Sequence, residues 1–165
     1  MVRASDWRES GGLDGRFFAH MEEIDLCWRL RSRGRGIVCI PQSVVYHVGA
    51  ATLKKENPRK TFLNFRNNLL MLYKNLPENE LKKVLFVRGA LDWLAAFVFL
   101  LKGDGKNARA VIQARKEFKR IRPDFASSRA ENLEKATDES IPEKATYSIL
   151  SKVRVCGRKV FHKWN

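Results

Sequence analysis

Cysteine is scarce in this chain of 165 residues, and its placement argues against two common classes of small protein. Cys27, Cys39 and Cys156 are odd in number and far apart, so they predict neither a disulfide framework nor the paired spacing of a zinc site. We therefore expect reduced cysteines in a cytoplasmic protein. The N-terminal residues also lack the apolar core of a signal peptide, so nothing in them indicates secretion.

Acidic residues are few relative to basic ones. The chain has 18 Asp and Glu against 32 Lys and Arg, which gives a net charge of +14. Such a charge suits an anionic partner: nucleic acid, an anionic membrane surface or a phosphorylated substrate. No recognised RNA- or DNA-binding motif accompanies it, and the basic residues interleave with a long apolar run, so nucleic acid is the least favoured partner.

An uninterrupted apolar run long enough to cross a membrane is also missing. Residues 84–101 come close, but Arg88 and Asp92 interrupt them, and these two can pair on one face of a helix. The unbroken part, 93–101, is too short to cross. We expect the segment to lie in or against a membrane interface, with Trp93 near its polar edge. A transmembrane hairpin with the preceding helix and a buried helix in a helical subdomain are the alternatives.

The surrounding sequence predicts an amphipathic, membrane-associated helical extension over residues 58–122. Residues 62–76 carry an amphipathic stripe that ends before Pro77. Residues 102–122 hold eight Lys or Arg residues around an apolar stripe, which is typical of a basic helix that binds a membrane surface or a partner. These features predict a peripheral protein on the inner, cytoplasmic face of the cell membrane. Residues 123–165 are expected to form a polar linker and a basic tail.

Residues 1–53 predict an α/β arrangement. A Gly-rich turn at 10–15 precedes a helix over 21–33, and two short β-rich runs follow at 36–41 and 43–49. Two such runs cannot make a stable sheet alone, so this part reads as the end of a larger domain. The expected fold class is an α/β fragment followed by a mainly α-helical extension.

Three carboxylates gather at the start of the expected helix. On a helical wheel, Glu22 and Asp25 fall on the polar arc, where Asp25 and Arg29 read as a surface ion pair. Glu23 falls on the apolar side, and a carboxylate that faces a core or a cleft needs a partner or a task. A functional Glu23 and an ordinary first-turn acid are both open at this point. His47 ends the second β-rich run, at the kind of strand end where ligands collect in α/β sheets.

Four segments in order, GGLDGRFF, HMEEIDLCWRLRSRG, IVCIP and VVYHVG, resemble the C-terminal part of the catalytic domain of family 2 glycosyltransferases. These are inverting enzymes with the GT-A fold. The order, spacing and residue types agree across residues 11–50, and the helices that follow resemble the membrane-associated extension of bacterial members. The resemblance implies an α/β fragment of a GT-A nucleotide-sugar transferase, with a nucleotide-sugar donor and a glycan or lipid-linked acceptor as partners in the complete enzyme.

The resemblance also implies roles for individual residues. Glu23 falls at the position of the general base, which deprotonates the acceptor hydroxyl as that oxygen attacks the anomeric carbon. His47 matches a histidine that completes the site of a divalent metal, Mg²⁺ or Mn²⁺, on the nucleotide diphosphate. The residues implied for the acceptor side are Gly12, Leu13, Asp14 and Glu22.

The sequence departs from the family in two main respects. Glu23 stands where the family usually has Asp, and the extra methylene shifts the carboxylate by roughly 1 Å. The nucleotide-binding half is the larger departure, because no D-x-D motif occurs in the chain and no series of strand–helix units precedes residue 11. We therefore expect a partial glycosyltransferase that transfers no sugar alone. The alternative is a basic amphipathic module that binds a membrane or nucleic acid without catalysis.

Overall fold

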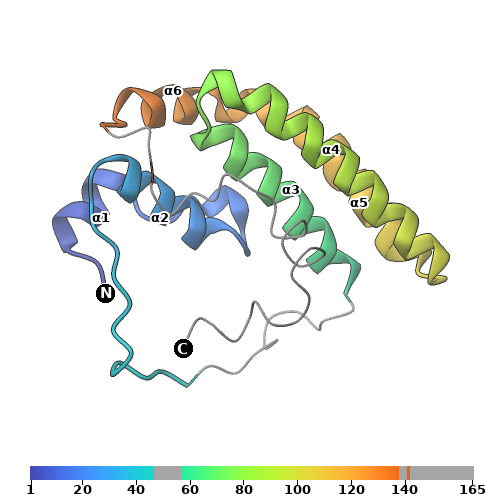
Figure 1. The fold of residues 1–165 in the computed structure, drawn as a ribbon, viewed down its shortest axis with the longest axis horizontal. Helices are drawn as coiled ribbons and strands as arrows, with labels where there is room; N and C mark the ends of the chain where they lie inside the picture. The colour runs from blue at the N-terminus through green and yellow to red at the C-terminus, as the bar shows by residue number, and fades with distance from the viewer. Residues whose placement is uncertain (47–56, 138–140, 142–165) are drawn as a thin grey trace, which may run out of the picture.

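Helices make up all the regular structure in the residues that the computed structural model describes, which are 1–46, 57–137 and 141. Helix α3 lies at the centre, with α2 on one side and α5 on the other, and α6 lies across its C-terminal end (Figure 1). In chain order the elements are α1 (Ala4–Ser10), η1 (Gly15–Phe17), α2 (Glu22–Ser32), α3 (Pro58–Asn75), α4 (Glu78–Leu101), α5 (Gly105–Ile121), η2 (Arg122–Phe125) and α6 (Ala126–Glu134).

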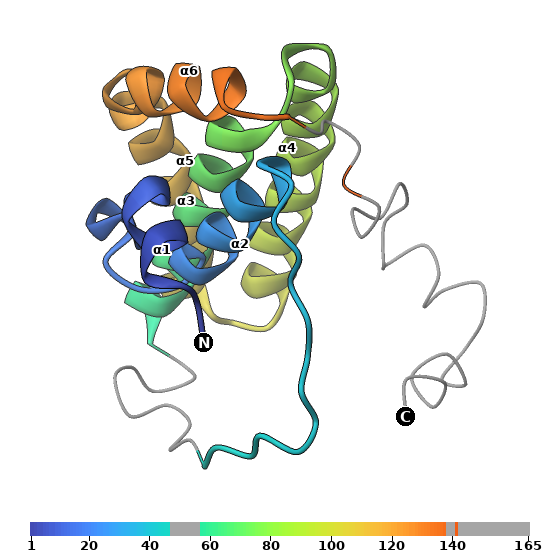
Figure 2. The same ribbon diagram turned by 90° about the vertical axis from the view of Figure 1, so that its left-hand side faces the viewer.

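The expected α/β arrangement of residues 1–53 is wrong: the described part of that unit forms helices and no strand. Residues 36–46, which hold most of the two expected strands, run as one segment that pairs with no other described strand (Figure 2). A lone segment has no neighbouring strand with which its N–H and C=O groups can form a ladder. Its apolar side chains are exposed accordingly, with 81% of Val38 and 82% of Val45 accessible. His47 falls just beyond it, outside the described residues.

The hydrophobic core forms where α3 meets α5 and the two 3₁₀ helices. Leu69 and Leu70 of α3 belong to the same buried cluster as Phe118 of α5. Phe17 of η1 meets Phe125 of η2 edge to face, with ring centroids 6.3 Å apart. The core therefore anchors the chain around residue 17 against the end of the helical extension.

The two helices of the expected extension that follow α3 form a hairpin, in which α5 runs back along α4 (Figure 1). Arg88 and Asp92 of α4 pair as the sequence predicts, with Nε 2.8 Å from Oδ1. Arg115 of α5 adds a second contact, with Nη1 2.7 Å from Oδ2 of Asp92. Helix α5 covers most of the predicted basic segment 102–122, and its apolar stripe is buried within the protein.

Residues 123–134, which were expected to begin a polar linker, are helical and packed against α3. Arg129 of α6 is buried and donates hydrogen bonds to the backbone carbonyls of Tyr73 and Leu76, while its Nη2 lies 2.9 Å from a carboxylate oxygen of Glu78. Carbonyls at the end of a helix have no partner within it, and Arg129 satisfies two of those at the end of α3. The segment reads as a linker because its buried face is polar.

Candidate functional site

Gly11 and Gly12 end α1 and open the GGLDG turn. Gly11 has a φ of 75° and closes α1 in the left-handed conformation. Gly12 has a φ of 62°, and a Cβ placed on it would lie 2.8 Å from the indole of Trp7. Both positions therefore favour glycine. The turn continues into η1, where Oδ1 of Asp14 accepts a hydrogen bond from the N–H of Arg16 at 3.1 Å.

Helix α2 buries its charged face. Asp25 is fully buried and Arg29 is 4% exposed, which corrects the expectation of a surface ion pair. The two residues do pair, with Nε of Arg29 3.0 Å from Oδ2 of Asp25. Arg29 also donates to the backbone carbonyl of Ser10 and, at 2.7 Å, to that of Gly12. These bonds compensate for burial of the charge and attach the acidic helix to the glycine turn.

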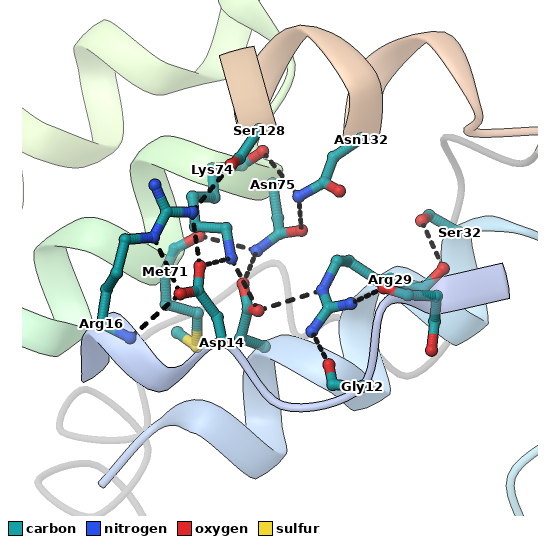
Figure 3. Close-up of polar contacts among 12 residues, drawn as sticks. Gly12, Asp14, Arg16, Arg29, Ser32, Met71, Lys74, Asn75, Ser128 and Asn132 are labelled. Carbon is teal, nitrogen blue, oxygen red and sulfur yellow. Dashed lines mark hydrogen bonds and ion pairs between the residues drawn. The ribbon is translucent and has the colours of Figure 1, made fainter. Parts of the chain in front are cut away.

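Helix α3 holds the same carboxylate from the other side. Nζ of Lys74 lies 2.9 Å from Oδ2 of Asp25 and 2.8 Å from Oδ2 of Asp14, and Nδ2 of Asn75 donates to Oδ1 of Asp25 at 2.8 Å. Arg16 donates to Asp14 from Nε at 2.8 Å and from Nη2 at 2.7 Å. The resulting polar network joins η1, α2 and α3 (Figure 3) and consists of Asp14, Arg16, Asp25, Arg29, Lys74 and Asn75.

Asp14 is ionised within the polar network. Burial alone would raise the pKa of its carboxyl group, but the hydrogen bonds from Arg16 and Lys74, together with the charge of Lys74, hold that pKa well below its ordinary value of 3.8. Both carboxylate oxygens are engaged. An acceptor hydroxyl would therefore have to share oxygens that Arg16 and Lys74 already bind.

The turn between η1 and α2 has an unusual backbone. Phe18, His20 and Met21 have φ angles of 67°, 71° and 75°, in regions that residues with side chains rarely adopt. Each such residue costs on the order of 1–3 kcal/mol, and the conformation persists only where the surroundings impose it. Strained turns of this kind cluster at functional sites.

Asn67 of α3 imposes this conformation. Its side chain is fully buried, and its Nδ2 lies 2.9, 2.8 and 2.9 Å from the carbonyl oxygens of Phe17, Ala19 and His20. Arg66 adds a bond to the Phe17 carbonyl at 3.1 Å. We call this arrangement the Asn67 clamp. It fixes the backbone that leads directly into the first turn of α2.

Glu23 lies exposed in that first turn, about 200° around the helix from Asp25, so it points away from the polar network. The helical wheel places Glu23 on the apolar side of this helix, but in the structure the side chains of Glu23 and of its neighbour Ile24 are exposed. Glu22 is half-buried, and its Oε2 is enclosed without a hydrogen-bond partner among the described residues, as is Nε2 of His20. Enclosed polar atoms without partners are rare in folded proteins, and here two of them flank the start of α2.

Residues 11–16 line a polar cleft of about 340 Å³, whose opposite wall comes from α6. Three of the four expected acceptor residues border it: Gly12, Leu13 and Asp14. Glu22 and Glu23 do not. The structure therefore brings most of the expected acceptor side together. It separates these residues from the expected base, Glu23, which lies on another face of α2.

The described part of the chain contains no group of three or more His, Cys, Asp and Glu side chains that can hold a metal ion. Asp14 and Asp25 approach each other, but Nζ of Lys74 bridges them where a cation would otherwise bind. His47, the expected metal ligand, lies outside the described residues. The described residues thus provide no complete metal site.

Asn67, Lys74 and Asn75 are the site residues that sequence reasoning missed. A signal for them exists, because Asn67 and Lys74 are seven residues apart and so share one stripe of α3. That spacing shows that the two residues share a face of α3, but only the structure shows that this face is buried. Comparisons of the chain with protein-family models, curated proteins and solved structures found no match.

Proposed function

We propose that this chain supplies the acceptor-side half-site of an inverting glycosyltransferase, with Glu23 as its general base. The proposal rests on the resemblance of residues 11–50 to family 2 glycosyltransferases and does not require the α/β fold expected for them. The nucleotide-sugar would bind to a separate nucleotide-binding half, and the acceptor would be a glycan or a lipid-linked sugar. The chain alone would transfer no sugar.

One observation supports the proposal most: the strained turn held by the Asn67 clamp runs directly into Glu22 and Glu23. A turn that places three residues with side chains at positive φ is costly, and its purpose here would be to fix the start of α2. Glu23 is exposed and makes no ion pair or hydrogen bond with the described residues, so its carboxylate is free to meet a substrate.

A free carboxylate at this position can accept a proton from an acceptor hydroxyl. As the proton moves to Glu23, the acceptor oxygen attacks the anomeric carbon of the donor sugar on the side opposite the diphosphate. The bond from the anomeric carbon to the phosphate oxygen breaks, the nucleoside diphosphate leaves with that electron pair, and the anomeric configuration inverts. Mg²⁺ or Mn²⁺ would neutralise the diphosphate on the donor side, with His47 as the ligand from this chain.

The activity of the complete enzyme tests the role of Glu23. The chain is joined to a nucleotide-binding half, and sugar transfer from the nucleotide-sugar is measured. Glu23→Gln is expected to lower kcat by about 10²–10⁴-fold because the general base is lost. Glu23→Asp keeps a carboxylate at the shorter length usual in the family, and we expect it to retain more activity than Glu23→Gln.

Two further variants separate the base from its neighbours. Glu134→Gln removes an exposed carboxylate on α6 and is the matched control, with the wild-type rate expected. Glu22→Gln is expected to raise KM for the acceptor more than it lowers kcat, as loss of a binding contact does. An unchanged rate in Glu23→Gln would remove Glu23 from the mechanism. Sugar transfer by the purified 165-residue chain would contradict the half-site proposal.

A second candidate function is binding to an anionic membrane surface without catalysis. The exposed apolar residues of α4 favour this function over binding to nucleic acid. Membrane binding itself is compatible with the first proposal, whose enzyme is expected to be a peripheral protein on the inner face of the cell membrane. Flotation with anionic vesicles, without a salt-dependent shift of an oligonucleotide, would support the membrane partner.

A further inference from the structure

Helix α4 exposes apolar side chains on its outer side and buries a charged residue on its inner side, unlike a typical surface helix of a soluble protein. Its buried positions include Gly89, Asp92 and Ala96, whereas eight of its large apolar side chains are exposed. Phe86 is 80% and Leu101 71% accessible, near the two ends of the apolar surface. We call this surface the α4 outer face, formed by Phe86, Val87, Trp93, Leu94, Phe97, Val98, Leu100 and Leu101.

The α4 outer face is one continuous surface. At 100° per residue its members cover an arc of about 160°, and they extend along the helix for about 22 Å. A contiguous apolar patch of this kind marks an interaction site in a soluble protein. Helix α4 is also long and apolar enough to cross a membrane, and only 17% of its most apolar 18-residue window is buried.

The inner side of α4 argues against a spanning orientation. Asp92 is fully buried near the middle of the helix, and Arg115 of α5 contacts its Oδ2 at 2.7 Å. Helix α5 runs back along α4 and exposes Arg109, Lys116 and Lys119 to solvent. If α4 crossed a bilayer, this contact would bring the cations of α5 near the bilayer centre, where charged side chains are costly.

We propose that α4 lies in the plane of an anionic membrane, with the α4 outer face in the hydrocarbon boundary and the Asp92–Arg115 pair turned inward. In this orientation Trp93 lies at the depth that its amphipathic ring prefers. Exposed cations stand at both ends of the apolar surface, with Lys82 and Lys83 before it and Lys102 after it. The inference does not depend on sugar transfer; it rests on the second candidate function, membrane binding, and specifies the surface and the orientation of that binding.

Charge identifies the membrane as anionic. The chain has a net charge of +14, and the exposed cations on α4 and α5 flank an apolar surface rather than a groove. Basic residues next to an apolar helix face add electrostatic attraction to anionic headgroups. A second copy of the chain would bring like charges together at the same surface, so lipid is the better match.

Vesicle flotation of the full chain tests the surface. We expect it to float with phosphatidylcholine vesicles that contain phosphatidylglycerol and to bind pure phosphatidylcholine more weakly. Leu94→Glu and Phe97→Glu are expected to weaken binding at least about tenfold, since each places a charge where the membrane would otherwise bury an apolar side chain. Val38→Glu changes an exposed apolar residue outside α4 and should leave binding unchanged.

Depth measurements test the orientation. Nitroxide labels are placed at Phe86, Leu94 and Leu101 in a chain whose three cysteines are replaced by serine. Equal depths in the bilayer are expected for a helix in the membrane plane. A spanning helix would separate the first two labels by about 12 Å in depth, since each residue adds 1.5 Å along the axis, and that result would overturn the orientation.

Other outcomes would overturn the surface itself. Absence of flotation with anionic vesicles would exclude the α4 outer face as a membrane-binding surface. Unchanged flotation of Leu94→Glu, with far-UV circular dichroism like that of the wild type, would move the contact away from α4. A dimer that forms without vesicles and is dissociated by Leu94→Glu would assign the α4 outer face to a second copy instead.

Discussion

Asn67 shows how one buried amide can shape a candidate site. Its Nδ2 group is shared by three backbone carbonyls in a turn where three residues with side chains have positive φ. A buried carbonyl without a donor costs about 1–3 kcal/mol, so the clamp offsets much of the strain in the turn. The neighbouring Asn68 differs, since its Oδ1 has no hydrogen-bond partner among the described residues.

Replacing Asn67 by leucine should therefore destabilise the protein out of proportion to the change in volume. We expect Asn67→Leu to lower the free energy of unfolding by at least about 2 kcal/mol, because the carbonyls of Ala19 and His20 lose their side-chain donor and that of Phe17 keeps only Arg66. Asn68→Leu, the matched control on the same helix, should change it by less than about 1 kcal/mol. Urea unfolding followed by circular dichroism measures both. Equal losses in the two variants would show that Asn67 does not hold the turn.

At the scale of elements, the positions of α2 and α3 follow from the sequence, but their orientations follow only in part. The helix predicted over residues 21–33 is observed as Glu22–Ser32, and the stripe predicted over 62–76 lies within α3. The predicted faces hold only in part. Leu69 and Leu76 of the predicted stripe are buried. Asp25 and Arg29 of α2 and Asn67 and Lys74 of α3 are buried as well, which a wheel that places polar residues outside does not predict.

The same cause explains why the candidate site was only partly predictable. The acidic helix and the glycine turn are visible as motifs in the sequence, since they depend on local residue types. Their contact through Arg29 and Lys74 depends on which charges find buried partners, and that is a property of the packed elements. The strands of the expected α/β unit failed for a related reason, because a strand needs neighbours that local sequence cannot supply.

The pairing of α4 with α5 provides a test at this scale. Asp92→Ala should lower the free energy of unfolding by about 3 kcal/mol, because Arg115 is left partly buried without its partner. The double variant Asp92→Leu with Arg115→Met should recover most of that loss, since an apolar pair can replace a buried ion pair. Chemical denaturation of the single and double variants measures the difference. A double variant as unstable as Asp92→Ala would mean that the charges themselves are required.

For the whole molecule, the polar network connects elements that are distant in the sequence. Through Arg16 it also reaches η2 and α6, where the guanidinium donates to the Asp124 carbonyl at 3.0 Å and to Ser128 at 2.7 Å. The conformation of the GGLDG turn therefore depends on helices more than a hundred residues later. A network of this kind makes the fold sensitive to the ionisation of its carboxylates.

Acid should weaken the protein through Asp14. Because the pKa of Asp14 is lower in the folded protein than its ordinary value of 3.8, its contribution to stability is complete above that pH and is lost as the pH falls below it. Asp14→Asn should therefore be less stable than the wild type at neutral pH, and the difference should shrink as the pH falls below about 4.

Thermal unfolding across a pH series measures this difference. Glu134→Gln, which changes an exposed carboxylate outside the network, should follow the wild type throughout the series. A gap between the wild type and Asp14→Asn that stays constant down to the lowest pH would contradict the assignment of Asp14 as an ionised member of the network.

Helix α3 also acts as a ruler. Asn67 and Lys74 are about two turns apart, or about 10.5 Å along one stripe of the helix. Asn67 binds the backbone just before α2, and Lys74 binds Asp25 within α2. A substitution between Asn67 and Lys74 changes only the packing of the core. Insertion or deletion of one residue between them would rotate one of these two side chains by about 100° around the helix relative to the other. The count of residues between these two side chains, more than the identity of those residues, therefore sets the registry of α2 on α3.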